Sequence, residues 1–105
     1  MAKNFNLVFD VVILKQLKKL SSDKNLRTLL AKLLDKIEEL GPDTGKLLDS
    51  HLNLYEVKMN RPLIRVYYKH VHASIELYVF EYGMKTSPEK QQKIIDRIRL
   101  KMLEP

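Results

Sequence analysis

The chain of 105 residues is 45% hydrophobic and 30% charged with few glycines and prolines, which is typical of one globular domain over residues 1–105 and excludes disorder and fibrous repeats. It has no cysteine, which excludes disulfides, thiolate metal ligands and a cysteine nucleophile and favours a cytoplasmic protein. No run approaches the ~20 apolar residues that cross a bilayer, so no membrane association is expected, and the net charge of +6 favours polyanionic partners.

The N-terminal half predicts a strand followed by an antiparallel pair of helices. Residues 5–9 alternate well enough for a short strand, and Asp10 is a suitable N-cap for an apolar stripe at helical spacing over residues 11–20. A polar loop at residues 21–25 caps a second helix, which ends at the Gly-Pro pair 41–42. The alternative for this helix is a coiled-coil seam. Its apolar stripe lasts only about two heptads before the Gly-Pro pair, which favours a face that packs on the core of the domain. Its apolar residues recur at spacings of three and four: Leu26, Leu29, Leu30, Leu33, Leu34, Ile37 and Leu40.

Three runs over residues 51–59, 62–70 and 72–80 are rich in β-branched and aromatic residues and predict an antiparallel meander. Alternation places one face of this sheet on the helices. The other face is expected to be a polar and aromatic surface, which carries Glu56, Lys58, Arg65, Tyr67, Lys69, Glu76 and Tyr78. Two interpretations remain open for these charges: a binding or catalytic site, or cross-strand ion pairs that join Lys58 or Arg65 to Glu56 or Glu76.

The C-terminal segment predicts one more helix. Ser87 and Pro88 form a good N-cap and first-turn pair, and an apolar stripe follows at Ile94, Ile95, Ile98 and Met102. The basic residues Lys90, Lys93, Arg97 and Lys101 lie largely on the other side, either as a solvated face or along a phosphate backbone. From residue 58 onward the chain holds ten Lys/Arg against five Asp/Glu, so the basic field is one-sided. The predicted fold class is α+β: a strand, an antiparallel helix pair, a three-stranded antiparallel meander and a C-terminal helix.

Common catalytic motifs are missing. The three glycines are scattered, and neither a phosphate-binding loop nor an HExxH motif is present, which argues against nucleotide hydrolysis. His70 and His72 have strand-like spacing, but zinc needs further ligands, so we expect no metal site and no cofactor. RNA cleavage remains possible, because the 2′-hydroxyl of RNA is its own nucleophile and needs only a base, an acid and cations around it.

The order of the segments and two stretches of sequence carry a resemblance to a known family. These stretches are GKLLDSHLNLYEVKMNRPLIRVYYK, residues 45–69, and FEYGMKTSPEKQQKIIDRIR, residues 80–99. Together they resemble the RelE/ParE toxin superfamily over nearly the whole chain, and most closely its HigB-like, phage-derived branch. The chain departs from that branch after Phe80, where Tyr82 and Gly83 stand in place of two lysines.

The resemblance implies the toxin of a type II toxin–antitoxin system. Such toxins are metal-independent endoribonucleases that cut messenger RNA on the ribosome and are held inactive by a cognate antitoxin. By this resemblance Arg65 and Lys58 stabilise the transition state, Lys85 assists, and Tyr82 stacks a base or transfers a proton. The residues expected to bind RNA or the ribosome are Arg61, Tyr67, Lys69, Lys90, Lys93 and Arg97.

The alternative is a non-catalytic protein of the same fold that binds RNA, the ribosome or another protein, and the missing lysine pair favours it. A pure protein-docking module is a third possibility. If the sheet face is open, Arg65→Ala should remove function and leave stability nearly unchanged.

Overall fold

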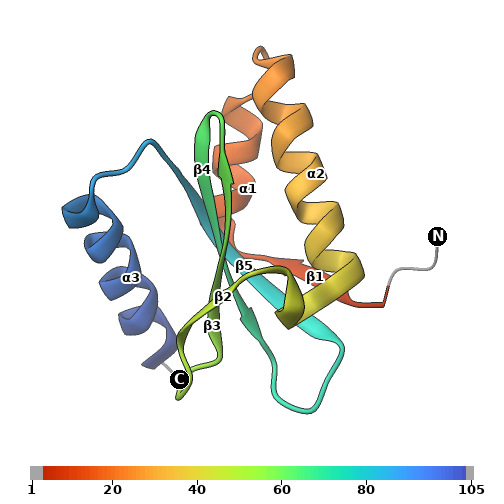
Figure 1. Cartoon of the computed structure of the whole chain (residues 1–105), viewed down its shortest axis with the longest axis vertical. Coiled ribbons are helices and arrows are strands. Elements are labelled where there is room, and N and C mark those ends of the chain that lie inside the picture. The colour runs from red at the N-terminus through yellow and green to blue at the C-terminus, as the bar shows by residue number, and fades with distance from the viewer. Residues whose placement is uncertain (1–3, 104–105) are drawn as a thin grey trace.

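The computed structural model describes residues 4–103, which form a five-stranded sheet with helices on both faces (Figure 1). The helices α1 and α2 cover one face, and α3 crosses the other. The predicted α+β class is confirmed. In chain order the elements are β1 Asn6–Phe9, α1 Val11–Lys19, α2 Lys24–Leu40, the 3₁₀ turn η1 Gly41–Thr44, β2 Lys46–Asp49, β3 Leu54–Asn60, β4 Leu63–His70, β5 Glu76–Met84 and α3 Pro88–Leu103.

The expected meander forms the centre of the sheet, where β3, β4 and β5 are antiparallel neighbours. Two further strands extend it, giving the order β1-β5-β4-β3-β2. β1 pairs in parallel with β5 at one edge, and β2 pairs antiparallel with β3 at the other. The sequence did not predict β2, which has only four residues. The expected order of strand, helix pair, meander and helix therefore holds, with one strand added.

The first two helices begin and end where side-chain chemistry dictates. Asp10 and Asp23 each accept a hydrogen bond, at 3.0 Å, from a backbone N–H in the first turn of the helix that follows. α2 ends at Gly41, whose φ of 58° is a left-handed value that favours glycine. The ring of Phe5 also occupies the space that a Cβ at this position would need. Any other residue at position 41 would therefore strain the backbone and collide with the ring of Phe5, which directly precedes β1.

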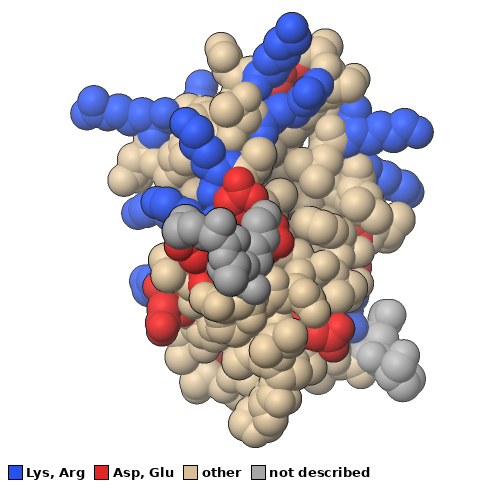
Figure 2. All heavy atoms as spheres, turned by 90° about the vertical axis from the view of Figure 1, so that its right-hand side faces the viewer, with Lys and Arg blue, Asp and Glu red and all other residues tan. Residues whose placement is uncertain are grey.

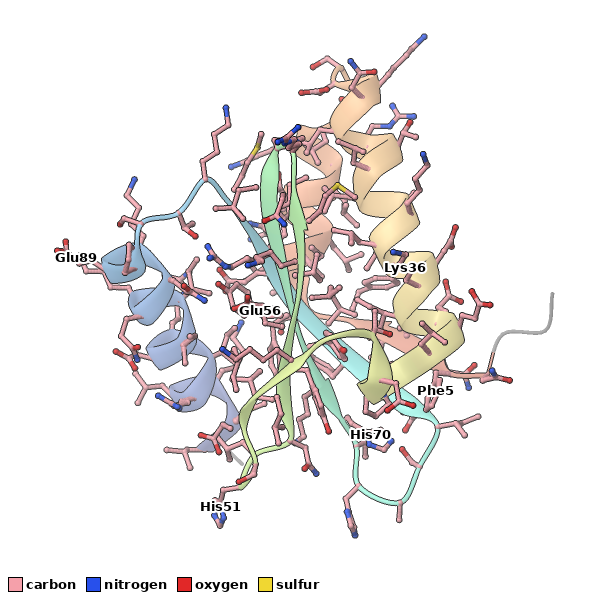
Figure 3. The ribbon with its side chains drawn as sticks, viewed as in Figure 1. Phe5, Lys36, His51, Glu56, His70 and Glu89 are labelled. Carbon is pink, nitrogen blue, oxygen red and sulfur yellow. The ribbon has the colours of Figure 1, made fainter. Side chains whose placement is uncertain are left out.

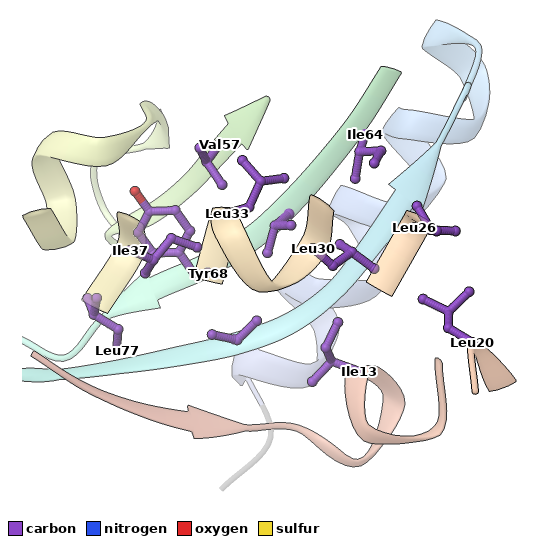
Figure 4. Packing of buried hydrophobic residues seen from close by; sticks show 12 residues of the cluster. Ile13, Leu20, Leu26, Leu30, Leu33, Ile37, Val57, Ile64, Tyr68 and Leu77 are labelled. Atoms are coloured by element: carbon purple, nitrogen blue, oxygen red, sulfur yellow. The ribbon is translucent and has the colours of Figure 1, made fainter. Parts of the chain in front are cut away.

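The main hydrophobic core lies between the helix pair and the sheet (Figure 4). Four residues of the predicted leucine stripe line it: Leu26, Leu30, Leu33 and Ile37. The stripe expected on α1 is narrower, because Ile13 is buried whereas Val11 and Leu14 are 58% and 51% exposed. α1 therefore buries little of its surface in this core, and α2 supplies most of the helical residues that line it.

A second core lies on the opposite face, under α3, and corrects the expectation that this face is open. Its buried residues are Leu54, Tyr67, Phe80, Ile94, Ile95 and Ile98. The stripe predicted on the C-terminal helix is thus a buried face, as its spacing indicated. The sheet is covered on both sides over its centre, and two cavities on the α3 side lie at the margins of that helix. Among the described residues, no helix combines the length and hydrophobicity that a membrane span requires.

Candidate active site

A cleft of about 460 Å³ opens at one margin of α3, between the first turns of that helix and the strands β2, β3 and β4. Four charged side chains enter it from three neighbouring strands. Lys58 and Arg65 are register partners on β3 and β4, and Lys46 and Glu56 are register partners on β2 and β3. Because register partners share a face of the sheet, all four side chains lie on the α3 side. The cleft therefore combines three cations with one carboxylate.

Glu56 is the centre of a hydrogen-bonded network that joins the sheet to α3 (Figure 3). Its Oε1 accepts from Arg65 Nε at 3.2 Å, and its Oε2 accepts from Gln91 Nε2 at 2.6 Å. Arg65 Nη1 also donates to Thr86 Oγ1 at 3.1 Å. The side chains of Arg65 and Glu56 are only 16% and 8% exposed, so both are held in place. The cross-strand pairing of Arg65 with Glu56, one of the two interpretations of the sequence, is present.

Arg65 still has capacity to bind a ligand. A guanidinium carries five N–H donors, and the two bonds to Glu56 and Thr86 leave three of them free among the described contacts. Lys58 is exposed on the neighbouring strand and has no ion-pair partner within the described part of the chain. The two cations can therefore contact the same phosphate from adjacent strands.

Tyr82 does not join this site, contrary to the prediction. It pairs in register with Val66 and packs into the core on the α1–α2 side, and its backbone N–H and C=O both bond to the side-chain amide of Gln16 at 2.9 Å. The physical reason is a β-bulge that shifts the register of β5 after Val79. One extra residue inverts the alternation, so Tyr82 and Arg65 lie on opposite faces of the sheet. Burial raises the pKa of the Tyr82 hydroxyl, with a further contribution from Asp23.

Tyr67 is not available to an RNA base. It is fully buried beneath α3, and its hydroxyl has no hydrogen-bond partner among the described residues. Burial, reinforced by the charge of Glu56, raises its pKa to about 12. The expectation of an exposed tyrosine was wrong because it relied on strand alternation, which says which face a residue occupies and nothing about what covers that face.

Lys69 lies away from the cleft, on the far side of α3. It lines a second cavity of about 280 Å³ together with Asp10, Tyr78 and Lys101. There the Asp10 carboxylate accepts from Lys101 Nζ at 2.9 Å and from the Tyr78 hydroxyl at 2.8 Å. This cluster ties the last turns of α3 to the start of α1, so Lys69 and the cleft residues do not form one site.

The remaining predicted cations lie on the surface around the cleft or on α3. Lys85 follows β5 with a φ of 50°, and its backbone N–H donates to the carbonyl of Leu63 beside the β3–β4 turn. Arg61 lies in that turn, and Lys90 and Lys93 are exposed on α3. Arg97 already forms an ion pair within the protein, since its Nη2 donates to the buried carboxylate of Glu81 at 2.7 Å.

The basic residues gather toward one end of the molecule. Figure 2 shows lysines and arginines crowding the upper part of one face, with most acidic side chains in its lower half. That end holds the α1–α2 loop and the β3–β4 turn (Figure 1). Its exposed cations come from both halves of the sequence and include Lys18, Lys19, Lys24, Arg27, Lys58 and Arg61. Positive charge from both halves of the sequence therefore meets at this end of the molecule.

The histidines form no metal cluster. His70 ends β4 and its Nε2 lies 2.8 Å from the carbonyl of Ser74, while His72 is exposed in the following loop, so the two do not share a strand face. His51 lies in another loop, well apart from His70 in Figure 3. Within residues 4–103, no three His, Asp or Glu side chains are placed to bind a metal ion together.

Sequence reasoning missed three residues of the site. Lys46 was missed with its short edge strand, although the Gly-Lys step that follows Thr44 was a usable signal for a turn into a strand. Gln91 and Thr86 are uncharged and far from Arg65 in the chain, and no local pattern marks them. Their roles follow only from the position of α3 on the sheet.

The fold has counterparts among solved structures. The isolated Escherichia coli RelE toxin matches with 25% sequence identity and a TM-score of 0.63, over 90% of this chain and 98% of RelE. The intact E. coli RelBE toxin–antitoxin complex matches with 25% identity and a TM-score of 0.62, over 79% of this chain and 99% of the matched chain. A conserved hypothetical protein from Helicobacter pylori has the same fold at 19% identity, with a TM-score of 0.54, over 77% of this chain and 94% of that one. No known sequence family and no curated protein matches the chain. The chain therefore has the fold of the RelE toxin, to which it is 25% identical.

Proposed function

We propose that this chain is the toxin of a toxin–antitoxin pair and a metal-independent endoribonuclease that cleaves messenger RNA on the ribosome. The observation that carries the proposal is the pairing of Lys58 with Arg65 in a cleft that also holds the Glu56 carboxylate. The likeness to RelE, alone and in its complex with an antitoxin, supports the same class. The similarity to the HigB-like branch rests on sequence pattern alone.

The cleft contains the groups that cleavage by the 2′-hydroxyl requires. The 2′ oxygen attacks the adjacent phosphorus and gives its proton to Glu56, while the P–O5′ bond breaks. Arg65 holds the non-bridging oxygens with its free N–H groups and stabilises the added negative charge. Lys58 gives a proton to the departing 5′ oxygen. The products are a 2′,3′-cyclic phosphate and a 5′-hydroxyl. Once they leave, Glu56 loses its proton to solvent and Lys58 regains one from solvent, which restores both groups.

The other predicted residues take different parts in this scheme. Tyr82 takes none, because the sheet separates it from the phosphate. Lys85, Arg61, Lys90 and Lys93 contact the RNA backbone around the cleft, as exposed cations do. A ribosomal substrate places the protein in the cytoplasm, and a cognate antitoxin silences it by covering the basic surface.

A second candidate, a non-catalytic RNA- or ribosome-binding protein, is favoured by one observation. Arg65 already bonds to Glu56 and Thr86 and is only 16% exposed, which is also what a purely structural ion pair would show. In that case the exposed cations bind the polyanion and no bond is cut.

Cleavage on purified translating ribosomes separates the two candidates. The message is mapped for new ends after addition of wild-type protein, Arg65→Ala, Arg65→Lys or Lys36→Ala. Lys36 is an exposed cation on α2, on the other side of the sheet from Glu56 in Figure 3, and its side chain does not line the cleft. Its removal changes the net charge by the same amount as Arg65→Ala.

We expect cleavage by wild type and by Lys36→Ala, and a loss of roughly 100-fold or more in both Arg65 variants, because lysine lacks the planar fork. New ends carrying a 5′-hydroxyl would support attack by the 2′-hydroxyl. An intact message at a concentration that saturates ribosome binding would leave the binding protein as the remaining candidate.

A further inference from the structure

We propose that Gln91 of α3 is a positioning residue for Arg65 and acts on it through Glu56. The inference rests on the proposed function for its effect on cleavage, but its geometric part concerns the fold alone. Gln91 does not reach the free donors of Arg65, and its role is to decide where those donors point.

The first link is the short bond between Gln91 and Glu56. Gln91 Nε2 donates to Glu56 Oε2 at 2.6 Å, and the opposite oxygen, Oε1, accepts from Arg65 Nε at 3.2 Å. A carboxylate held at one oxygen can still turn about its terminal torsion, which is broad. With both oxygens held it cannot, so its bond to Arg65 has a fixed direction. Gln91 thereby fixes the plane of the arginine fork.

The second link is Thr86, which holds the other side of the same guanidinium. Thr86 Oγ1 accepts from Arg65 Nη1 at 3.1 Å. Thr86 is seated over Gly83, where an added Cβ would lie 3.0 Å from the threonine methyl and 3.2 Å from the Ile94 side chain. Gly83 stands where the resemblance leads us to expect a basic residue. Because it has no side chain, it leaves room for Thr86 to contact Arg65.

Both links belong to one short segment, residues 86–91. Ser87 caps α3 through its hydroxyl, which accepts from the N–H of Lys90 at 3.2 Å, and its carbonyl accepts from the N–H of Gln91 at 2.9 Å. The start of α3 is therefore rigid, and it carries Thr86 and Gln91 at a set separation. Arg65 is held between these two residues and the sheet, so the seating of α3 controls the arginine.

The test replaces the donor without changing the packing. Gln91→Met has a similar shape and lacks the N–H, and Thr86→Val replaces the hydroxyl on the other side of the guanidinium with a methyl group. The matched control is Gln92→Met, because Gln92 is exposed and its amide bonds to Asp96 on the same helix, away from the cleft. Each variant is measured for single-turnover cleavage on ribosomes and for the NMR resonance of the Arg65 Nε–H group.

A positioning role predicts that Gln91→Met lowers the cleavage rate at saturation by about 10- to 100-fold while the half-saturating concentration stays within about twofold of wild type. The Arg65 Nε–H resonance should shift and exchange faster with water. Thr86→Val should act in the same direction, and Gln92→Met should match wild type in both readouts. A merely structural role would change the melting temperature and leave the Arg65 resonance of the folded protein in place.

The two proposals fail separately. If wild type cleaves and Gln91→Met is indistinguishable from Gln92→Met, the positioning role is wrong and the enzyme stands. If wild type does not cleave, the proposed function is wrong, and the NMR readout still decides: a shifted Arg65 resonance in Gln91→Met supports positioning, and an unchanged one overturns it. If Gln91→Met does not fold, Gln91→Leu, which also lacks the N–H donor, is measured by the same two readouts and decides the question.

Discussion

Arg65 and Glu56 are diagonal neighbours on β4 and β3, with Nε and Oε1 3.2 Å apart, and both side chains are mostly buried at the edge of the cleft. This relationship changes what a substitution at Arg65 tests. On an open sheet face the arginine would contribute little to stability, but here it satisfies a carboxylate that water barely reaches.

We therefore expect Arg65→Ala to lower the free energy of unfolding by about 1–3 kcal/mol, because it removes a charged donor and leaves Glu56 with Gln91 alone. This revises the expectation from sequence that stability would be unchanged. Replacing both partners, as in Arg65→Met with Glu56→Met, should restore most of the loss, since no charge is then buried without a partner. Urea unfolding at pH 7 measures both variants, and equal stability of wild type and Arg65→Ala would contradict the argument.

Tyr67→Phe is expected to leave the free energy of unfolding unchanged or to raise it by up to about 1 kcal/mol. The hydroxyl is buried without a well-formed hydrogen bond among the described residues, and the nearby Gln91 side chain offsets only part of the effect of burial on its pKa. Removing the hydroxyl therefore removes a poorly satisfied, desolvated polar group. Cleavage should persist, because the ring lies under α3. A loss greater than 1 kcal/mol in urea unfolding would show that the hydroxyl has a partner, such as a bound water.

Asp10 predicts a pH dependence of stability. Burial tends to raise the pKa of its carboxyl, but bonds from Lys101, the N–H of Val12 and Tyr78 outweigh this and lower the pKa below its ordinary 3.8. Between 3.8 and that lower value the unfolded chain binds more protons than the folded one. The contribution of Asp10 is therefore complete above the ordinary pKa and is lost as pH falls through the folded one.

The measurement is urea unfolding from pH 2.5 to 6 for wild type and Asp10→Asn. The wild-type free energy of unfolding should fall more steeply with acidification than that of the variant. Lys101→Met serves as a second probe, because it should raise the pKa of Asp10 in an NMR titration. Parallel stability curves for wild type and Asp10→Asn would show that the carboxyl has the same pKa in both states.

Leu33→Ala should lower the free energy of unfolding by about 2–5 kcal/mol, since it opens a cavity beneath α2 in the main core. Leu100→Ala is the matched control: Leu100 is 66% exposed on α3, and its truncation should stay within about 0.5 kcal/mol of wild type. Similar losses in the two variants would contradict the packing in Figure 4.

Local patterns in the sequence determined the helices, the central meander and, as far as the bulge in β5, the side of each of its strands on which the residues lie. Helical spacing identified the buried stripes of α2 and α3 because a helix repeats its face every three to four residues. Alternation placed Lys58 and Arg65 on one face because a strand repeats every two. These periods act between near neighbours, so they can be read without knowing the rest of the molecule.

Only the tertiary structure decided which face was open and which residues shared the cleft. α3 covers the face that alternation left polar and turns Tyr67 into a core residue. One bulged residue in β5 inverts the alternation and moves Tyr82 away from Arg65. Gln91 and Thr86 reach the arginine because the helix returns across the sheet. Such contacts join residues far apart in the chain, so no periodic pattern in the sequence predicts them. They depend on how the helix packs on the sheet.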